Sequence, residues 1–316
     1  MKSMSSRLPK ELKERALQLH GKGTIVEIAK RLGIPKSTLW DFYETAEAKE
    51  RLNADRDGPK ILFLDVETSM SLVYTFDRFK AFVKPEAVMT EPYLLTYAYA
   101  YGDEDEIYSH KLTDFDLFDF DITNDFSLVS KLRDLLDKAD IVVAHNARFD
   151  VGWFNQRCCY WFIAPPSPYK VICTYSELKR HFSLPSNSLD SSTRYFNLDK
   201  KLSHEGISLW IGCMQGKREC FEAMENYNRG DINTLKQLYL TIRPFIKAHP
   251  NVSLYYKDTI PRCAKCGSSS LTEADSYYYT ASSRFKVLSC QNCGSNNRSK
   301  SNELKKEKTK SMLNGA

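Results

Sequence analysis

The chain has 316 residues, of which 42% are hydrophobic and 27% are charged. This length and balance suit a globular protein with one good-sized core and small accessory modules. The sequence has no apolar run of the roughly 18 residues that a membrane span needs, and its polar, basic N-terminus does not look like a secretory signal. We therefore expect an intracellular protein that binds no membrane.

The net charge of +5 is unevenly distributed along the chain. Residues 1–59 and 257–316 are net basic, whereas residues 60–256 are net acidic. Basic flanks suit a protein that holds a polyanion, and an acidic centre suits one that binds cations. The alternative is that these charges only solvate the surface.

Residues 1–56 have the pattern of three short helices, the first around Glu11–His20, the second capped by Thr24 and the third opened by Pro35. Gly33 in the turn between the second and third helices predicts a helix-turn-helix. Three residues of the third helix are candidates for contact with a nucleic-acid backbone: Lys36, Ser37 and Thr38. A three-helix bundle without a ligand is the alternative.

Residues 57–256 alternate between strand and helix patterns, which predicts an α/β domain. The expected strands are Ile61–Val66, Leu94–Tyr101, Ile107–Leu112, Ile141–Ala144 and Val171–Thr174. The expected helices are Phe126–Ala139, Val151–Trp161 and a long helix from about Lys217 to about Ile242.

Two carboxylates lie at the end of the first of these strands. Asp65 and Glu67 are two residues apart, so their side chains point to the same face. Carboxylates this close repel each other unless a proton or a divalent cation neutralises one of them. Asp-x-Glu at a strand end is also common by chance.

Two further elements carry acidic residues in positions that suit a ligand. Asp150 lies at a strand-to-helix junction, where open α/β sheets bind ligands, although a helix cap is an equal alternative. Tyr227 and Asp231 are four residues apart and share one face of the last helix. Tyr227 in the core and Asp231 in solvent would be the alternative there.

The specific feature is the order of these elements: Asp-x-Glu on the first strand, Asn-x-x-Phe-Asp after a later strand, and Tyr-x-x-x-Asp on the final helix. This order resembles the tyrosine subclass of the DEDD-superfamily 3′–5′ exonucleases. The chain looks most similar to stand-alone phage and bacterial exonucleases related to the proofreading domain of family B DNA polymerases. The resemblance covers roughly residues 60–246 and implies an RNase H-like mixed β-sheet flanked by helices.

The resemblance also implies a two-metal site with Mg²⁺ or Mn²⁺. Asp65, Glu67 and Asp231 would bind one ion, Asp65 would bridge to a second held by Asp150, and Tyr227 would orient the attacking water. Three neighbours are candidate substrate-binding residues: Thr68, His145 and Asn146. The implied reaction shortens single-stranded or frayed 3′ ends and releases nucleoside 5′-monophosphates.

DNA is favoured over RNA as the nucleic-acid partner, because helix-turn-helix units mostly bind DNA. The chain is too short to hold a polymerase, so the enzyme would act alone or with a replication or recombination partner, in the cytoplasm or, if phage-encoded, in the host cytoplasm. A transposase-like or resolvase-like nuclease of the RNase H-like fold is one alternative. A nucleic-acid-binding regulator with an inactive nuclease core is another.

Four cysteines in two Cys-x-x-Cys pairs predict one structural Zn²⁺: Cys263, Cys266, Cys290 and Cys293. Residues 257–298 would then form a zinc ribbon, and residues 299–316 a basic disordered tail. A redox dithiol pair is the alternative. The ribbon's aromatic and basic residues would either grip a single strand or only cover the hairpin: Tyr277, Tyr278, Tyr279, Arg284 and Lys286. The other five cysteines are expected to be buried thiols: Cys158, Cys159, Cys173, Cys213 and Cys220.

Overall fold

The computed structural model describes residues 8–19, 25–43, 45, 58–76, 79, 82–102, 104–198 and 206–313. The chain divides into two compact units, Met1–Asp57 and Gly58–Ala316. Within the described ranges, no helix is both long enough and apolar enough to cross a membrane.

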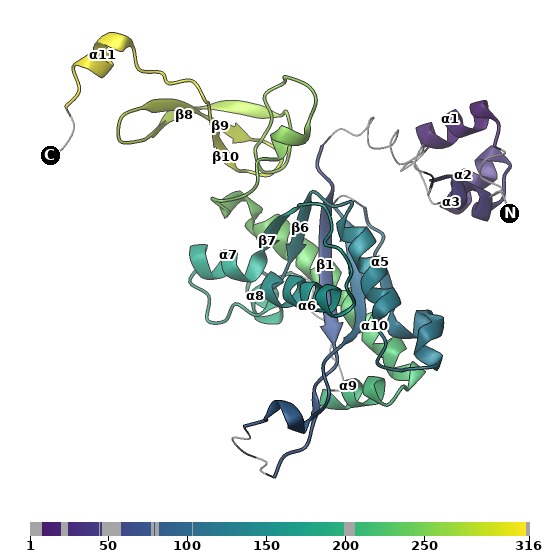
Figure 1. The fold of residues 1–316 in the computed structure, drawn as a ribbon. Helices are drawn as coiled ribbons and strands as arrows, with labels where there is room; N and C mark the ends of the chain where they lie inside the picture. The colour runs from purple at the N-terminus through teal and green to yellow at the C-terminus, as the bar shows by residue number, and fades with distance from the viewer. Residues whose placement is uncertain are drawn as a thin grey trace. The chain divides into compact units, whose positions relative to one another are not determined.

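The first unit consists of three short helices around a small core (Figure 1). They are α1 (Lys10–Leu19), α2 (Ile25–Leu32) and α3 (Lys36–Tyr43). Gly33 has a φ of 67°, a left-handed conformation that glycine adopts without strain, and it ends α2 as the sequence predicts. The expected cap Thr24 and the end of the first helix at His20 lie outside the described residues.

The second unit is built on a five-stranded sheet in the order β5-β4-β1-β6-β7. The strands are β1 (Ile61–Thr68), β4 (Leu94–Tyr101), β5 (Tyr108–Lys111), β6 (Ile141–Ala144) and β7 (Lys170–Cys173). β1, β4 and β5 pair antiparallel, while β6 and β7 continue the sheet parallel to β1. This mixed sheet, with helices on both faces, confirms the predicted mixed α/β class and is compatible with an RNase H-like fold.

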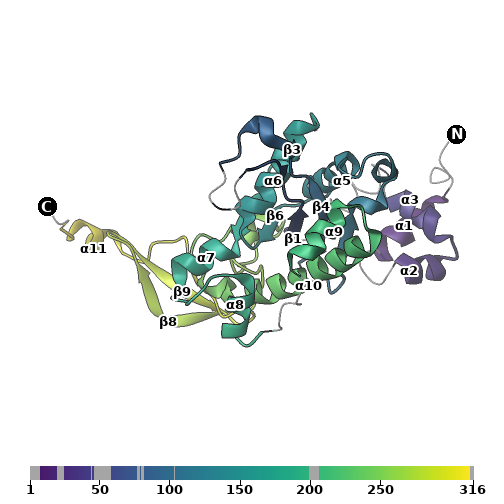
Figure 2. The ribbon, with the colours of Figure 1, turned by 90° about the horizontal axis from the view of Figure 1, so that it is seen from below.

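Helices cover both faces of the sheet and bury two separate cores (Figure 2). The helices are α5 (Phe126–Leu136), α6 (Ala147–Tyr160), α7 (Thr174–His181), α8 (Leu189–Tyr195), α9 (Ile207–Met214) and α10 (Arg218–Ile242). One core takes its helical residues from α5, α6, α9 and the N-terminal half of α10. The other takes them from α7, α8 and the C-terminal half of α10.

Side chains alternate between the two faces of the sheet along β1, and this decides where its acidic residues point. Leu62 and Leu64 enter the core beneath α5 and α6, whereas Phe63 enters the core beneath the second half of α10. Asp65 and Glu67 continue the face of Phe63, because side chains two residues apart in a strand share a face. The register with β4 shifts between Glu67 and Thr68, so β1 is irregular where its carboxylates end.

Several predicted boundaries differ from the structure. α6 begins at Ala147 instead of Val151, so Asp150 lies inside the first turn of the helix. α5 ends at Leu136 instead of Ala139, because the last three residues turn back toward β6. α10 has close to the predicted bounds, Arg218–Ile242, and continues unbroken through Gly230, since its apolar residues on both sides are buried in the two cores.

Other elements have weak sequence signals and were not predicted. They are the two-stranded β2 (Leu72–Val73) and β3 (Val88–Thr90), and the short 3₁₀ helices η2 (Pro85–Ala87), η3 (Leu112–Asp114), η4 (Asp116–Asp119), η5 (Arg243–Phe245) and η6 (Val252–Tyr255). Helices α7, α8 and α9 were also not predicted. Each of these three helices spans only two turns, which is too short for a clear helical period.

The C-terminal part of the second unit is a three-stranded sheet in the order β10-β9-β8. Its strands are β8 (Leu271–Tyr279), β9 (Arg284–Cys290) and β10 (Asn296–Arg298). β8 and β9 form an antiparallel hairpin, and β10 pairs with β9 as the third strand. Within the tail that was expected to be disordered, Lys306–Lys310 form the short helix α11, so that expectation is wrong for these residues.

Candidate active site and cysteine centre

Three carboxylates from two elements meet beside the sheet. Oxygen atoms of Asp65, Glu67 and Asp231 all lie within 4.8 Å of one another. β1 supplies the first two, and α10, which crosses the same face of the sheet, supplies Asp231, whose side chain is 2% exposed. We call these three residues the carboxylate cluster. Such a set of close, partly buried oxygen ligands suits a hard divalent cation such as Mg²⁺ or Mn²⁺.

Asn228 holds one member of the carboxylate cluster in place. Its side-chain Nδ2 donates to Oδ2 of Asp65 at 2.5 Å and lies 3.2 Å from the backbone oxygen of the same residue. Asn228 is fully buried and lies on α10, three residues before Asp231. Its role was not predicted, although its spacing of three from Asp231 places both side chains on neighbouring positions of one helix.

Asp150 approaches the cluster from the other side of β1. Its side chain is 2% exposed, and Oδ1 accepts a hydrogen bond of 3.0 Å from the backbone N–H of Val66. Burial, followed by the nearby charge of Asp65, raises the pKa of Asp150 well above its usual value. Its other oxygen, Oδ2, is buried and has no hydrogen-bond partner among the described residues. A bound cation would supply the partner that this buried oxygen lacks.

A cavity of about 520 Å³ opens over these carboxylates. Its lining residues are Asp65, Val66, Glu67, His145, Asn146, Phe149, Asp150, Tyr175, Ser188, Leu189 and Asp231. Most of them lie near the carboxyl end of β1 or soon after the carboxyl ends of β6 and β7, the edge where α/β sheets bind ligands. The cavity therefore joins the acidic residues to a space that can admit a substrate.

His145 and Asn146 lie on this edge, as expected. The Nδ1 atom of His145 is 2.9 Å from the hydroxyl of Thr174, and its ring meets that of Tyr175 edge to face. Asn146 has a φ of 65°, a left-handed conformation that asparagine tolerates better than most residues. This turn redirects the chain from β6 into α6 and so brings Asp150 beneath the cavity.

The remaining predicted site residues differ in their burial. Tyr227 is 7% exposed in the hydrophobic core, with its ring centroid 6.3 Å from that of Trp210, and it is not among the cavity-lining residues of the described chain. Thr68 is buried at the end of β1 and does not line the described cavity either. Lys36 and Ser37 are exposed at the start of α3, and Thr38 is partly exposed.

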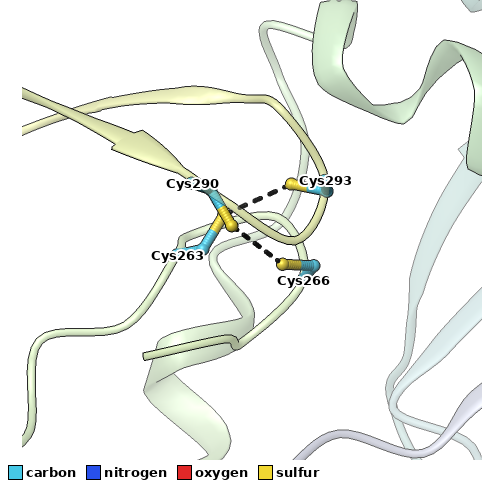
Figure 3. Close-up of side chains that lie close together, drawn as sticks. All are labelled: Cys263, Cys266, Cys290 and Cys293. Atoms are coloured by element: carbon cyan, nitrogen blue, oxygen red, sulfur yellow. Dashed lines mark hydrogen bonds between the residues drawn. The ribbon is translucent and has the colours of Figure 1, made fainter. Parts of the chain in front are cut away.

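The second cluster of metal-ligand type consists of the four cysteines Cys263, Cys266, Cys290 and Cys293 (Figure 3). We call it the cysteine cluster. Its Sγ atoms are 3.7 Å apart between Cys263 and Cys293 and 3.5 Å apart between Cys266 and Cys290. Four thiolates at about 2.3 Å from a central zinc would be about 3.8 Å apart, so the cluster has the dimensions of a tetrahedral Zn²⁺ site.

Both cysteine pairs sit on the same kind of turn. The N–H of Gly267 donates to the oxygen of Cys263, and the N–H of Gly294 donates to that of Cys290, each at 2.9 Å. Both glycines have a φ near 75°, which permits the tight turn that aims two thiols at one point. The repeated geometry fits a zinc ribbon.

The remaining cysteines have mixed exposure. Cys158 and Cys213 are buried and Cys173 and Cys220 are partly buried, but Cys159 is exposed. The expectation of a buried thiol is therefore wrong for Cys159. Cys158 and Cys159 are neighbours on α6, so only one of them can face the core.

No known protein family matches this sequence, and no curated protein matches it either. Among solved structures, the crystal structure of the Mos1 strand transfer complex is similar at 12% sequence identity, with 74% of this chain and 78% of that chain covered and a TM-score of 0.18. A similarity this weak supports no shared activity.

Proposed function

We propose that the chain is a metal-dependent 3′–5′ exonuclease that hydrolyses the terminal phosphodiester bond of nucleic acid and releases nucleoside 5′-monophosphates. The observation that carries this proposal is the carboxylate cluster, which lies with buried Asp150 at the floor of one cavity. DNA is the preferred substrate over RNA, and single-stranded or frayed 3′ ends fit an open cavity at a sheet edge.

Each residue has a stated task in this proposal. The carboxylate cluster would hold one Mg²⁺ or Mn²⁺, and Asp65 and Asp150 would hold a second. Two such ions supply charge stabilisation for the attacking and leaving oxygens of an in-line displacement. Asn228 keeps Asp65 oriented through its hydrogen bond.

The water-orienting role of Tyr227 rests on the resemblance to the tyrosine subclass and on its position one helical turn before Asp231. Tyr227→Phe tests this role by itself, because the change removes the hydroxyl and keeps the ring against Trp210. We expect a lower rate with unchanged thermal stability. An unchanged rate would assign Tyr227 to the core alone.

The test of the proposal is a cleavage assay with 5′-labelled oligonucleotides, DNA and RNA, single- and double-stranded, in Mg²⁺ and in Mn²⁺. A 3′–5′ exonuclease gives a ladder that shortens one nucleotide at a time and disappears when the divalent ion is left out. Binding without shortening in either metal would leave a nucleic-acid-binding protein with an inactive core. Internal cuts in a circular single strand would identify an endonuclease instead.

A further inference from the structure

The hairpin formed by β8 and β9 carries a set of exposed tyrosines outside the sites described above. Tyr277 pairs with Lys286 and Tyr279 pairs with Arg284 across the two strands. Directly opposed residues of an antiparallel pair share a face, so these four side chains lie together on one side of the hairpin. We call this side the tyrosine face.

The opposite side of the hairpin carries one buried and one half-exposed aromatic ring. Tyr278 pairs with Phe285, which is only 9% exposed and lies beneath the guanidinium of Arg298 at 4.4 Å. The same guanidinium is 5.4 Å from the ring of Tyr278. Phe285 is the buried aromatic residue on that side, whereas Tyr278 is 50% exposed, with the Arg298 guanidinium near its ring.

The two rings of the tyrosine face are exposed to solvent and bury little of the hairpin. Tyr277 is 44% exposed and Tyr279 is 65% exposed, with their centroids 6.4 Å apart. Arg284 is partly buried and lies over the ring of Tyr277 at 4.4 Å, a cation–π contact that fixes the ring. Two exposed rings held beside a guanidinium present the surface on which unpaired bases stack.

The segment around the tyrosine face has an excess of positive charge, which suits the binding of a polyanion. Lys286 adds a second cation to the tyrosine face, and its ion pair with Glu273 at 2.8 Å is exposed and weak enough for a phosphate to compete. Beyond β10 the chain continues along β9, where the N–H of Glu303 donates to the oxygen of Arg284. Residues 284–310 contain eight lysines and arginines against two glutamates.

We infer that the tyrosine face is a binding site for single-stranded nucleic acid, with bases stacked on Tyr277 and Tyr279 and phosphates held by Arg284, Lys286 and the lysines that follow β10. The inference deepens the proposed function and rests on it, since it supplies a grip on the same class of substrate. A single strand fits this face better than a duplex does, because a duplex keeps its base faces inside the stack.

The experiment measures binding of the full-length zinc-loaded chain to a fluorescein-labelled thymidine 20-mer by anisotropy, with no Mg²⁺ or Mn²⁺ added. Tyr277→Ala/Tyr279→Ala is expected to weaken binding about tenfold or more, from the usual contribution of base stacking on aromatic side chains. Tyr277→Phe/Tyr279→Phe is expected to bind like the wild type, because stacking needs the ring and not the hydroxyl. Tyr278→Ala, on the opposite side, is the matched control and is expected to change binding little.

A second measurement does not depend on any variant. Photo-crosslinking of the wild-type chain to an oligonucleotide that contains 5-iodouracil, followed by mass spectrometry, should identify Tyr277 or Tyr279 as attachment sites. Wild-type affinity of the alanine double variant with zinc retained, crosslinks confined to other residues, or equal losses for duplex and single strand would each overturn the inference.

These readouts separate the inference from the proposed function. If the chain shortens DNA and the tyrosine variants bind normally, only the tyrosine face is wrong. If the variants lose single-strand binding and the wild type shortens no substrate, the tyrosine face stands and the exonuclease does not.

Discussion

The carboxylate cluster and the cysteine cluster are built in opposite ways. The cysteine cluster comes from two local turns with equivalent backbone hydrogen bonds, which bring its four sulfur atoms together. The carboxylate cluster needs a strand and a helix that are far apart in the chain, and it opens into a cavity of about 520 Å³. A closed set of thiolates suits a structural metal, whereas an open set of carboxylates suits a metal that must meet a substrate.

The largest effect should come from the carboxylate cluster itself. Asp65→Ala removes the residue that is expected to contact both cations, and we expect the cleavage rate to fall at least about a thousandfold, since several kcal/mol of transition-state stabilisation are lost. The exposed Asp105→Ala is the matched control and should cut normally. Single-turnover rates on a 5′-labelled single strand measure both. If Asp65→Ala cuts like the control, the site is elsewhere.

Asn228→Ala should have the next largest effect. The change removes the hydrogen bond that orients Asp65, and comparable supporting residues around metal sites cost about 10- to 100-fold in metal affinity or activity. We expect the Mn²⁺ concentration for half-maximal rate to rise by that factor, with partial recovery of the rate at high Mn²⁺. Asn155→Ala, on an exposed position of α6, is the control. A reduced rate with an unchanged Mn²⁺ requirement would contradict the orienting role.

The cysteine cluster should respond independently of the chemistry. Cys263→Ser breaks one thiolate of the proposed zinc site, and we expect the variant to lose its zinc and to bind single strands about tenfold more weakly, because the hairpin that carries the tyrosine face depends on the metal. Its rate on a saturating short substrate should stay within about twofold of the wild type. The exposed Cys159→Ser is the control. Zinc released on thiol modification measures the first effect, and full zinc content in Cys263→Ser would argue against a four-cysteine site.

The same contrast explains how much could be predicted from the sequence. The cysteine cluster was visible because Cys-x-x-Cys-Gly, repeated once, encodes the complete turn within five residues. The carboxylates Asp65 and Asp231 were visible only as an ordered pattern, and their meeting depends on the path of α10 across the sheet. Local sequence does not encode such a crossing.

What the sequence did not reveal depends on tertiary contacts. Asn228 looks like any polar residue of a helix, and only the neighbouring strand makes it a partner of Asp65. The buried ion pair of Asp125 with Arg157 was not predicted for the same reason. Asp125 precedes α5, Arg157 lies on α6, and Trp161 also donates to Asp125. The contact of Tyr227 with Trp210 was not predicted either, because it depends on α9, a helix too short to predict.

The smallest effect concerns stability without divalent metal. The folded chain raises the pKa of Asp150 above its unfolded value, so the native state binds more protons than the unfolded state across the window between the two values. The free energy of unfolding of the metal-free protein should therefore fall as pH rises through that window. Asp150→Asn removes the titrating group, and we expect it to flatten this slope and to raise the melting temperature near neutral pH by about 2–4 °C.

Thermal unfolding of the zinc-loaded protein without Mg²⁺ or Mn²⁺, between pH 5 and 8, measures this effect, with Asp105→Asn as the control. The cysteine cluster provides the contrast, because thiolates bind their metal more weakly as pH falls, so loss of zinc destabilises the ribbon in the acidic direction. Adding Mn²⁺ should stabilise the wild type more than Asp150→Asn, since a cation needs the ionised carboxylate. Equal stabilisation of both would mean that Asp150 is a buried structural acid and that the cation is held without it.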